Sequence, residues 1–255
     1  MSKIFIESTG SGEPILFIHG LGGTSNIFLP QVSVLARFFA CHRFDLPGAG
    51  LSESEGQNTI DALVDSAISV IDKVGATGRI TVIAHSLGTV IAQHLAIRIP
   101  ERVRAMALIG PVHAPADAAR IAIRARAEKA RAEGLLEIAD QIVAAGTSAQ
   151  TKTHRPEVAA FIRELIMRQP AEGYARHCEA LASAQPADVG KIDVPTLLIT
   201  GDEDNTSPAP AAQALTLKFP DAELKIIGRT GHWTTLERPY EVSELLVNFL
   251  LAKKQ

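Results

Sequence analysis

The chain has 255 residues, with 25 basic and 28 acidic side chains and a formal charge of −3. This length suits one large α/β domain, or a core domain that carries an insertion. The balanced charge argues against a nucleic-acid surface or a polybasic membrane anchor, and no run approaches the ~20 apolar residues that span a bilayer. We therefore expect a cytoplasmic protein that binds neither nucleic acid nor membrane. Its oligomeric state, monomer or homodimer, stays open.

The amino terminus and the cysteines also favour a reducing compartment. The apolar run Ile4–Ile6 is too short for the core of a signal peptide. Cys41 and Cys178 lie far apart and show neither metal-ligand nor redox-pair spacing, so two reduced thiols are expected. The histidines show no metal-ligand spacing either, and the sequence predicts no metal and no cofactor.

Short apolar runs alternate with amphipathic segments along the first 111 residues. Helical spacing of apolar residues marks Thr59–Lys73, with Thr59 as N-cap, and Leu87–Ile99. Strands that are apolar along their whole length suit a parallel sheet covered on both faces, so this alternation predicts an α/β fold. The runs of strand length are Ile4–Ile6, Ile15–Ile18, Phe39–Phe44, Ile80–Ala84 and Val103–Ile109.

The alternation stops after Pro111. Residues 112–186 are rich in Ala, Arg and Glu, and they predict about four helices and no strand. Strand-type runs return at Val194–Thr200 and Glu223–Ile227, and Tyr240–Leu251 is an amphipathic helix. We predict a doubly wound, mostly parallel sheet made by residues 1–111 and 187–255, with a helical cap at 112–186. Because ligands bind beyond the carboxyl ends of the strands in such sheets, the cap would cover the site.

A serine stands at the exit of one predicted strand. In Ala84-His85-Ser86-Leu87-Gly88, small residues lie two positions before and after Ser86, between a buried strand and a helix. A turn this sharp strains the serine backbone and projects Oγ above the sheet, where a substrate can reach it. The alternative is a strand-to-helix turn that carries an incidental serine.

Acids and an imidazole follow two later strands. Asp202, Glu203 and Asp204 follow the run at Val194–Thr200, and His232 follows the last predicted strand. A serine hydroxyl is a weak nucleophile near neutral pH, and an imidazole can accept and return its proton. A buried carboxylate then holds the imidazole in one tautomer and stabilises the imidazolium. We therefore predict Ser86 as nucleophile and His232 as base, with the acid open among three carboxylates.

The oxyanion of a tetrahedral intermediate needs N–H donors that are already in place. The Leu87 amide follows the nucleophile at a helix N-terminus, so it is one candidate. The glycine-rich loop that begins at His19 follows another strand, and we assign the second donor to the Leu21 amide.

Taken together, these segments resemble the α/β-hydrolase fold family over almost the whole chain. The resemblance implies that Asp204 is the acid, that Asp202 and Glu203 are turn-forming or solvated, and that Asp45 stabilises a loop. The segments that carry it, in family order, are His19-Gly20, Asp45-Leu46-Pro47-Gly48-x-Gly50-x-Ser52, the serine turn, Gly201-x-x-Asp204-x-x-x-Pro208 and Gly231-His232.

Within this family the chain is most similar to 3-oxoadipate enol-lactonases, through its size, its helical cap and the stretch from Gln169 to Leu181. This implies a serine esterase or lactonase that cleaves a small-molecule ester or lactone through an acyl-enzyme. A serine nucleophile excludes the haloalkane dehalogenase and epoxide hydrolase branches, which carry Asp there. Trp233 is also typical of the meta-cleavage C–C hydrolases, which are a competing hypothesis. A slowly hydrolysing small-molecule receptor, or a cofactor-free haloperoxidase-like or perhydrolase activity, would also fit this fold and triad.

Two further groups of residues are candidates for substrate contact. The predicted pocket residues are His19, Gly20, His85, His113 and Trp233. A basic stripe in the predicted cap would suit a dicarboxylate-like lactone. Because Arg124 and Glu128 have the i,i+4 spacing of an ion pair, we interpret that stripe as a solvent-exposed face. Its members are Arg120, Arg124, Arg126, Lys129 and Arg131.

Overall fold

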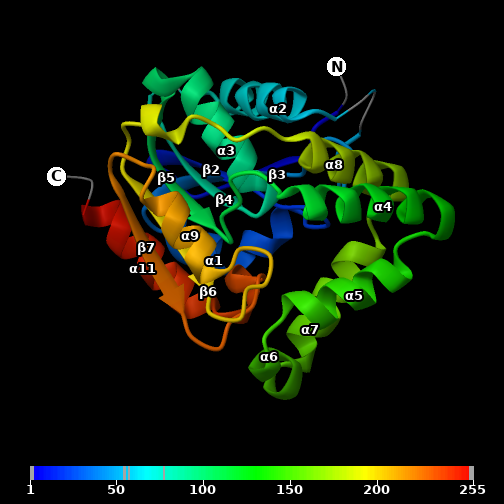
Figure 1. Cartoon of the computed structure of the whole chain (residues 1–255). Helices are drawn as coiled ribbons and strands as arrows, with labels where there is room; N and C mark the ends of the chain where they lie inside the picture. The colour runs from blue at the N-terminus through cyan, green and yellow to red at the C-terminus, as the bar shows by residue number, and fades with distance from the viewer. Residues whose placement is uncertain (1–2, 54–55, 57, 77, 253–255) are drawn as a thin grey trace.

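The computed structural model describes residues 3–53, 56, 58–76 and 78–252, which form one seven-stranded sheet between layers of helices (Figure 1). The strand order is β1-β3-β2-β4-β5-β6-β7. Only β1 runs antiparallel to its neighbour, so the predicted fold class is confirmed. The strands are β1 (Ile6–Thr9), β2 (Glu13–Ile18), β3 (Phe39–Phe44), β4 (Ile80–His85), β5 (Val103–Ile109), β6 (Thr196–Gly201) and β7 (Ala222–Ile227).

The continuous apolar runs of the strands supply two separate cores. In β2, Ile15 and Phe17 face one core and Leu16 and Ile18 face the other, because successive strand residues point to opposite faces. Helices α1 (Leu29–Leu35) and α11 (Pro239–Ala252) pack together on the first face. Helices α2 (Ile60–Lys73), α3 (Leu87–Arg98) and α9 (Ala209–Thr216) cover the second, and the short α10 (Thr234–Glu237) precedes α11.

Most predicted boundaries are within two residues of the observed ones. Thr59 caps α2, because its Oγ1 accepts the Ala62 amide at 3.1 Å. The first strand is the exception: it was expected at Ile4–Ile6 and lies at Ile6–Thr9. This edge strand is half-exposed and mostly polar, so the nearby apolar run predicts it at the wrong position. Helices α1 and α9 were also not predicted from the sequence.

A helical segment (residues 117–183) separates β5 from β6. It lies at one side of the sheet, where α4 runs beside α8 and α5 packs on α7 (Figure 1). Residues 112–186 are all described and contain no strand, but they form five helices where about four were expected. The helices are α4 (Asp117–Glu133), α5 (Leu136–Gly146), α6 (Ala149–His154), α7 (Pro156–Met167) and α8 (Ala171–Ser183).

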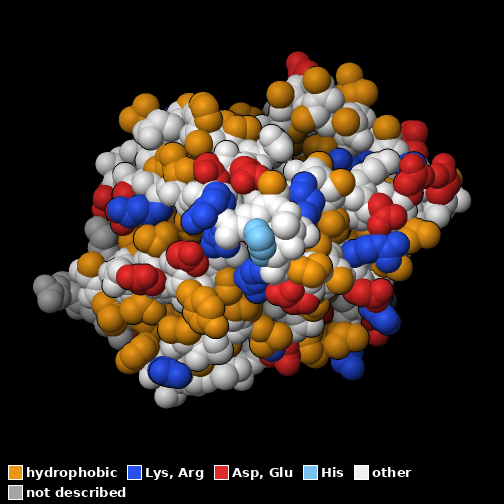
Figure 2. All heavy atoms as spheres, turned by 90° about the horizontal axis from the view of Figure 1, so that it is seen from below, with side chains coloured by type: hydrophobic (Ala, Val, Ile, Leu, Met, Phe, Trp, Pro, Cys, Tyr) orange, Lys and Arg blue, Asp and Glu red, His pale blue; other side chains and the backbone are white. Residues whose placement is uncertain are grey.

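We propose the domain division that the sequence predicts, with residues 112–186 as a cap on a core of residues 1–111 and 187–255. The surface carries mixed charges on the face that Figure 2 shows, where basic and acidic side chains are interspersed with apolar ones. Over the described ranges, no helix combines the length and the apolar character needed to cross a bilayer.

Candidate active site

Ser86 occupies the turn between β4 and α3, where its backbone is strained. Its φ of 53° and ψ of −120° place a non-glycine residue in the left-handed half of backbone space. Small neighbours make the turn possible, since a Cβ at Gly88 would collide with the Ile18 carbonyl oxygen of β2. Gly20 is equally constrained, because its Cβ would lie 2.7 Å from that of Ser86. The close packing of β2, the turn and α3 therefore holds the Ser86 backbone in its strained conformation.

Three side chains from three loops form a continuous chain of hydrogen bonds. His232 Nε2 lies 2.8 Å from Ser86 Oγ, and His232 Nδ1 lies 2.8 Å from Asp204 Oδ2. A carboxylate only accepts hydrogen bonds, so Nδ1 carries the proton and Nε2 is left to accept the serine hydroxyl proton. All three residues are buried, with 3% of Asp204 and 7% each of Ser86 and His232 exposed.

The three acids that follow β6, of which the family resemblance implies Asp204 as the acid, have different hydrogen-bond partners. Burial alone would raise the pKa of Asp204, but His232 and the amides of Thr206 and Ser207 outweigh it and lower this pKa. Those two amides donate to Asp204 Oδ1 at 2.8 Å each. Asp202 instead accepts the Thr230 amide, and Glu203 accepts an amide of α6. Asp204 is thus the acid that is hydrogen-bonded to His232, and the two backbone amides help to keep it ionised.

Neighbouring groups hold the loop that carries His232. The His232 amide donates to the Gly146 carbonyl of α5 at 2.8 Å, and His85 Nε2–H donates to the His232 carbonyl at 2.9 Å. The His85 ring packs against the rings of His232 and Trp233, with centroids 4.9 and 5.6 Å apart. Burial lowers the pKa of His85 to about 3, so this imidazole is neutral and acts as a packing and hydrogen-bonding group.

Gly110 is a further residue of this site that the sequence analysis missed. It directly follows β5 with a φ of 55°, and a Cβ there would lie 2.9 Å from His232 Cε1. Only glycine therefore lets the chain pass under the imidazole. A glycine that follows a strand is too common to identify such a position by itself.

The two amides assigned to the oxyanion lie beside Ser86. Neither the Leu21 nor the Leu87 amide donates to another described residue, so both are available to a ligand atom. The loop of Leu21 is held by His19, whose Nδ1–H donates to the Gly20 carbonyl while Nε2 accepts the Leu46 amide, each at 2.9 Å. Burial lowers the pKa of His19, in keeping with this neutral role.

A cavity of about 440 Å³ opens above Ser86. On the core side it is lined by Leu21, Ser86, Asn205, Thr206, His232 and Trp233, and helices α4, α5 and α8 supply mainly small and apolar residues.

Of the predicted pocket residues, Trp233 lines this cavity, whereas His19, Gly20, His85 and His113 do not. The His19 and His85 side chains instead form hydrogen bonds with the backbone carbonyls of Gly20 and His232, and Gly20 packs against Ser86. His113 lies outside because its Nε2–H donates to the Ala187 carbonyl at 2.8 Å.

The alpha/beta hydrolase family model matches residues 15–245. The chain belongs to the alpha/beta hydrolase family. It is 29% identical to 2-hydroxymuconate semialdehyde hydrolase of a Pseudomonas species, over 96% of this chain and 89% of that one. Among solved structures it resembles a thermophilic esterase from Thermogutta terrifontis (TM-score 0.96, 26% identity, 100% and 95% covered) and the enol-lactonase from Burkholderia xenovorans (TM-score 0.91, 26% identity, 98% and 97% covered).

In this hydrolase a buried carboxylate joins the histidine loop to the helical segment. Glu237 is fully buried, and its Oε2 accepts both the Ser148 amide and the Thr151 hydroxyl at 2.8 Å. Two residues between α5 and α7 are therefore tied to the end of α10, close to Gly231, where a Cβ would lie 2.8 Å from Glu237 Oε1. Sequence analysis missed this contact, because it joins residues 86 to 89 positions apart.

Asp45 lies in a loop of the hydrolase core and does not line the cavity. It accepts the Ser25 amide at 2.8 Å and the Leu51 amide at 3.0 Å, as a loop-stabilising residue would. Cys41 and Cys178 are free and buried, and burial raises the pKa of each thiol to about 12. Among the residues with described positions, no group of three or more His, Cys, Asp or Glu could hold a metal ion.

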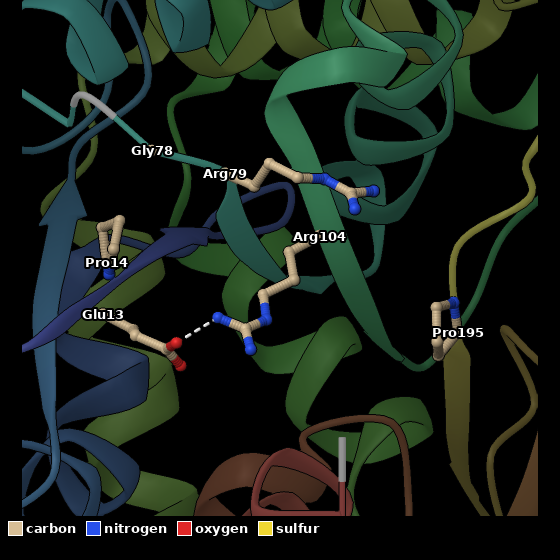
Figure 3. Close-up of a pocket in the computed structure, with 6 residues that line it drawn as sticks. All are labelled: Glu13, Pro14, Gly78, Arg79, Arg104 and Pro195. Atoms are coloured by element: carbon tan, nitrogen blue, oxygen red, sulfur yellow. Dashed lines mark hydrogen bonds and ion pairs between the residues drawn. The ribbon is translucent and has the colours of Figure 1, made fainter. Parts of the chain in front are cut away.

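A second, more open hollow of about 600 Å³ lies at the opposite end of the sheet of this hydrolase. Figure 3 shows Arg104 directed towards Glu13, with which it forms an ion pair, while the Arg79 side chain turns away. The Arg79 guanidinium donates to the Val103 carbonyl. These arginines have partners within the chain, and the hollow is separated from Ser86 by the length of the strands.

Proposed function

We propose that this hydrolase is a serine hydrolase that cleaves a small-molecule ester or lactone through an acyl-enzyme, with Ser86, His232 and Asp204 as its catalytic triad. The observation that carries the proposal is the unbroken hydrogen-bonded chain from Asp204 through His232 to a strained Ser86. Its nucleophilic oxygen lies at the floor of a cavity that is large enough for a small substrate. The esterase and the enol-lactonase that share the fold support this reaction class.

The geometry supports a two-step mechanism. His232 Nε2 removes the proton from Ser86 Oγ as this oxygen bonds to the acyl carbon, and the carbonyl oxygen takes up the negative charge beside the amides of Leu21 and Leu87. Collapse of the intermediate breaks the bond to the alcohol or enol oxygen, which receives the proton from His232. Water then attacks the acyl-enzyme by the same route, and the acid is released with Ser86 restored. Asp204 stays ionised throughout and orients the imidazole.

A C–C bond hydrolase is the second candidate. Trp233 lines the cavity beside His232, and a relative of similar length is named as a 2-hydroxymuconate semialdehyde hydrolase. We favour an ester or lactone, as in a 3-oxoadipate enol-lactonase, because an esterase and an enol-lactonase are among the solved structures that share the fold, each at 26% identity. We further propose that the protein acts in the cytoplasm, without a cofactor.

A substrate panel tests the proposal. Wild-type protein and Ser86→Ala would be assayed against p-nitrophenyl acetate to octanoate, simple lactones, enol-lactones and a ring-fission product of the meta-cleavage type. Many turnovers of an ester or lactone that depend on Ser86 would support the proposal. Preference for the ring-fission product would favour the C–C hydrolase, and a single burst without turnover would favour the receptor hypothesis.

A further inference from the structure

One fixed positive charge lines the cavity above Ser86. Arg126 of α4 is half-buried and contributes to the cavity wall, together with Ala119, Ala122 and Ile123 of the same helix. These residues have the i, i+3, i+4, i+7 spacing of one helix face, so the face that α4 turns to the cavity is apolar until it reaches Arg126. Apart from the imidazole of His232, the other described residues that line this cavity are uncharged.

The other basic residues of the stripe have partners outside the cavity. Arg120 donates to the carbonyls of Ala182 and Ala184, and Lys129 pairs with Glu137. Arg131 pairs with two carboxylates of α8. The prediction of a solvent-exposed face therefore holds only in part. Arg124 and Arg131 are exposed and Lys129 pairs at the surface, whereas Arg126 lines the cavity.

Arg126 differs from them in its surroundings. No carboxylate of the described residues lies within 4.0 Å of its guanidinium, and the expected Arg124–Glu128 pair is not formed either. Its polar neighbour is the hydroxyl of Tyr174, a neutral group that is buried. Burial raises the pKa of Tyr174, and the Arg126 charge partly offsets this rise. A half-buried guanidinium thus faces the cavity with no counter-charge from the described protein.

The position of Tyr174 shows which end of the cavity carries the charge. A Cβ at Gly22 would lie 3.2 Å from the Tyr174 ring, so this ring packs against the loop that holds the Leu21 amide. Arg126 therefore lies at the end of the cavity next to the predicted oxyanion loop. Since Arg126 is seven residues beyond Ala119, the apolar face of α4 before it is roughly 10 Å long.

We propose that Arg126 selects substrates that carry a carboxylate, which it binds at one end of the cavity while Ser86 attacks the ester or lactone carbonyl. This proposal rests on the proposed function and names its substrate class. A guanidinium presents two parallel N–H groups that match a carboxylate, and the pairing is strong where water is partly excluded. The residues of α4 that line the cavity beside Arg126 are apolar, which suits the hydrocarbon part of such a substrate.

Matched esters test this inference. Mono-(p-nitrophenyl) adipate would be compared with p-nitrophenyl 6-methylheptanoate, a neutral ester in which an isopropyl group replaces the carboxylate. A second pair, 4-carboxyphenyl acetate and 4-isopropylphenyl acetate, places the charge on the leaving group. For at least one pair, we expect wild-type protein to favour the charged ester in kcat/KM. Arg126→Gln should lower this ratio about 10- to 100-fold, mainly through KM.

Two further variants separate recognition from general damage. Arg126→Lys keeps the charge but not the planar pair of donors, and it should restore part of the ratio. Arg124→Gln removes an exposed arginine of the same helix and should keep the wild-type ratio for both pairs. An Arg126→Gln protein with the wild-type ratio for both pairs would overturn the inference.

Calorimetric binding of adipate gives a readout that does not need turnover. Adipate should bind Ser86→Ala, and Arg126→Gln should weaken this binding about 10-fold or more. Binding that depends on Arg126 without any ester hydrolysis would support the anion site while refuting the proposed function. Hydrolysis that depends on Ser86 but is indifferent to the carboxylate and to Arg126 would support the function and overturn the inference.

Discussion

The loops at the carboxyl edge of the sheet and the helical segment above them are built in opposite ways. In the loops, fixed hydrogen bonds hold the groups of the site: Asp204 accepts two amides and His232, and His85 supports the histidine backbone. The cavity face of the helical segment is mostly apolar and includes an arginine with no carboxylate partner among the described residues. Preorganised polar groups suit the chemical step, whereas an apolar wall with one unpaired charge suits the choice of substrate.

The two regions nevertheless touch at defined points. The Gly146 carbonyl receives the His232 amide, and Glu237 receives the Ser148 amide and the Thr151 hydroxyl. On the other side, α8 packs so closely on the loop after β3 that a Cβ at Gly173 would collide with the Gly48 carbonyl. If the loops carry out the chemical step and the helical segment selects the substrate, substitutions in the two regions should change kcat and substrate preference separately.

The largest effect should come from the nucleophile. Ser86→Ala should lower kcat by roughly 10⁴–10⁶-fold with little change in the melting temperature, because the three side chains act as a unit. Steady-state kinetics and a thermal melt measure both quantities. Activity that survives in Ser86→Ala would place the reaction somewhere other than these loops.

The second-largest loss of kcat should come from a substitution of the acid, Asp204. Asp204→Asn should lower kcat by roughly 10³–10⁴-fold, because an amide cannot hold the His232 tautomer that accepts the serine proton. Asp202→Asn is the matched control, since Asp202 supports the neighbouring Thr230 amide and does not reach His232. If the Asp202 variant were the less active of the two folded proteins, the assignment of the acid would be wrong.

A methyl group placed in each region tests the separation directly. Gly110→Ala should lower kcat by roughly 10–100-fold, because the added Cβ displaces His232. It should also cost about 1 kcal/mol of stability, because alanine is strained at positive φ. Gly134→Ala in the helical segment has a φ of 78° and nothing within 4 Å, so it should show a similar loss of stability and unchanged kcat. Equal losses of kcat in the two variants would contradict the separation.

The last effect concerns the pH dependence of stability and the attachment of α8. His177 Nε2–H donates to the Pro47 carbonyl, and burial lowers the pKa of His177 to about 3. The unfolded chain, with an ordinary imidazole, binds a proton below about pH 6.5 that the folded protein does not, so stability falls as pH is lowered from about 6.5 towards 3. Between pH 7 and 5, His177→Gln should lose about 2 kcal/mol less of its free energy of unfolding than wild type. Urea unfolding at both pH values measures this difference, and parallel losses would show that the imidazole is not buried in the folded protein.

Much of the core could be predicted from the sequence, because its signals are local. Strands buried on both faces are apolar along their length, and the turn at Ser86 needs small residues within two positions. The acid could be chosen only through the family resemblance, since Asp202 and Asp204 follow the same strand and their difference lies in which one faces His232. Gly110 and Glu237 could not be found either, because their contacts join segments that are distant in the chain.

The sequence by itself determined the sheet, the order of serine, acid and histidine, and the presence of a helical segment between β5 and β6. Periodicity and turn chemistry are properties of neighbouring residues, so they can be followed along the chain. Only the tertiary structure decided which side of each helix faces the cavity. Arg124 and Arg126 stand two residues apart on α4, yet about 200° of helical rotation separates them, so one is exposed and the other lines the cavity beside Ser86.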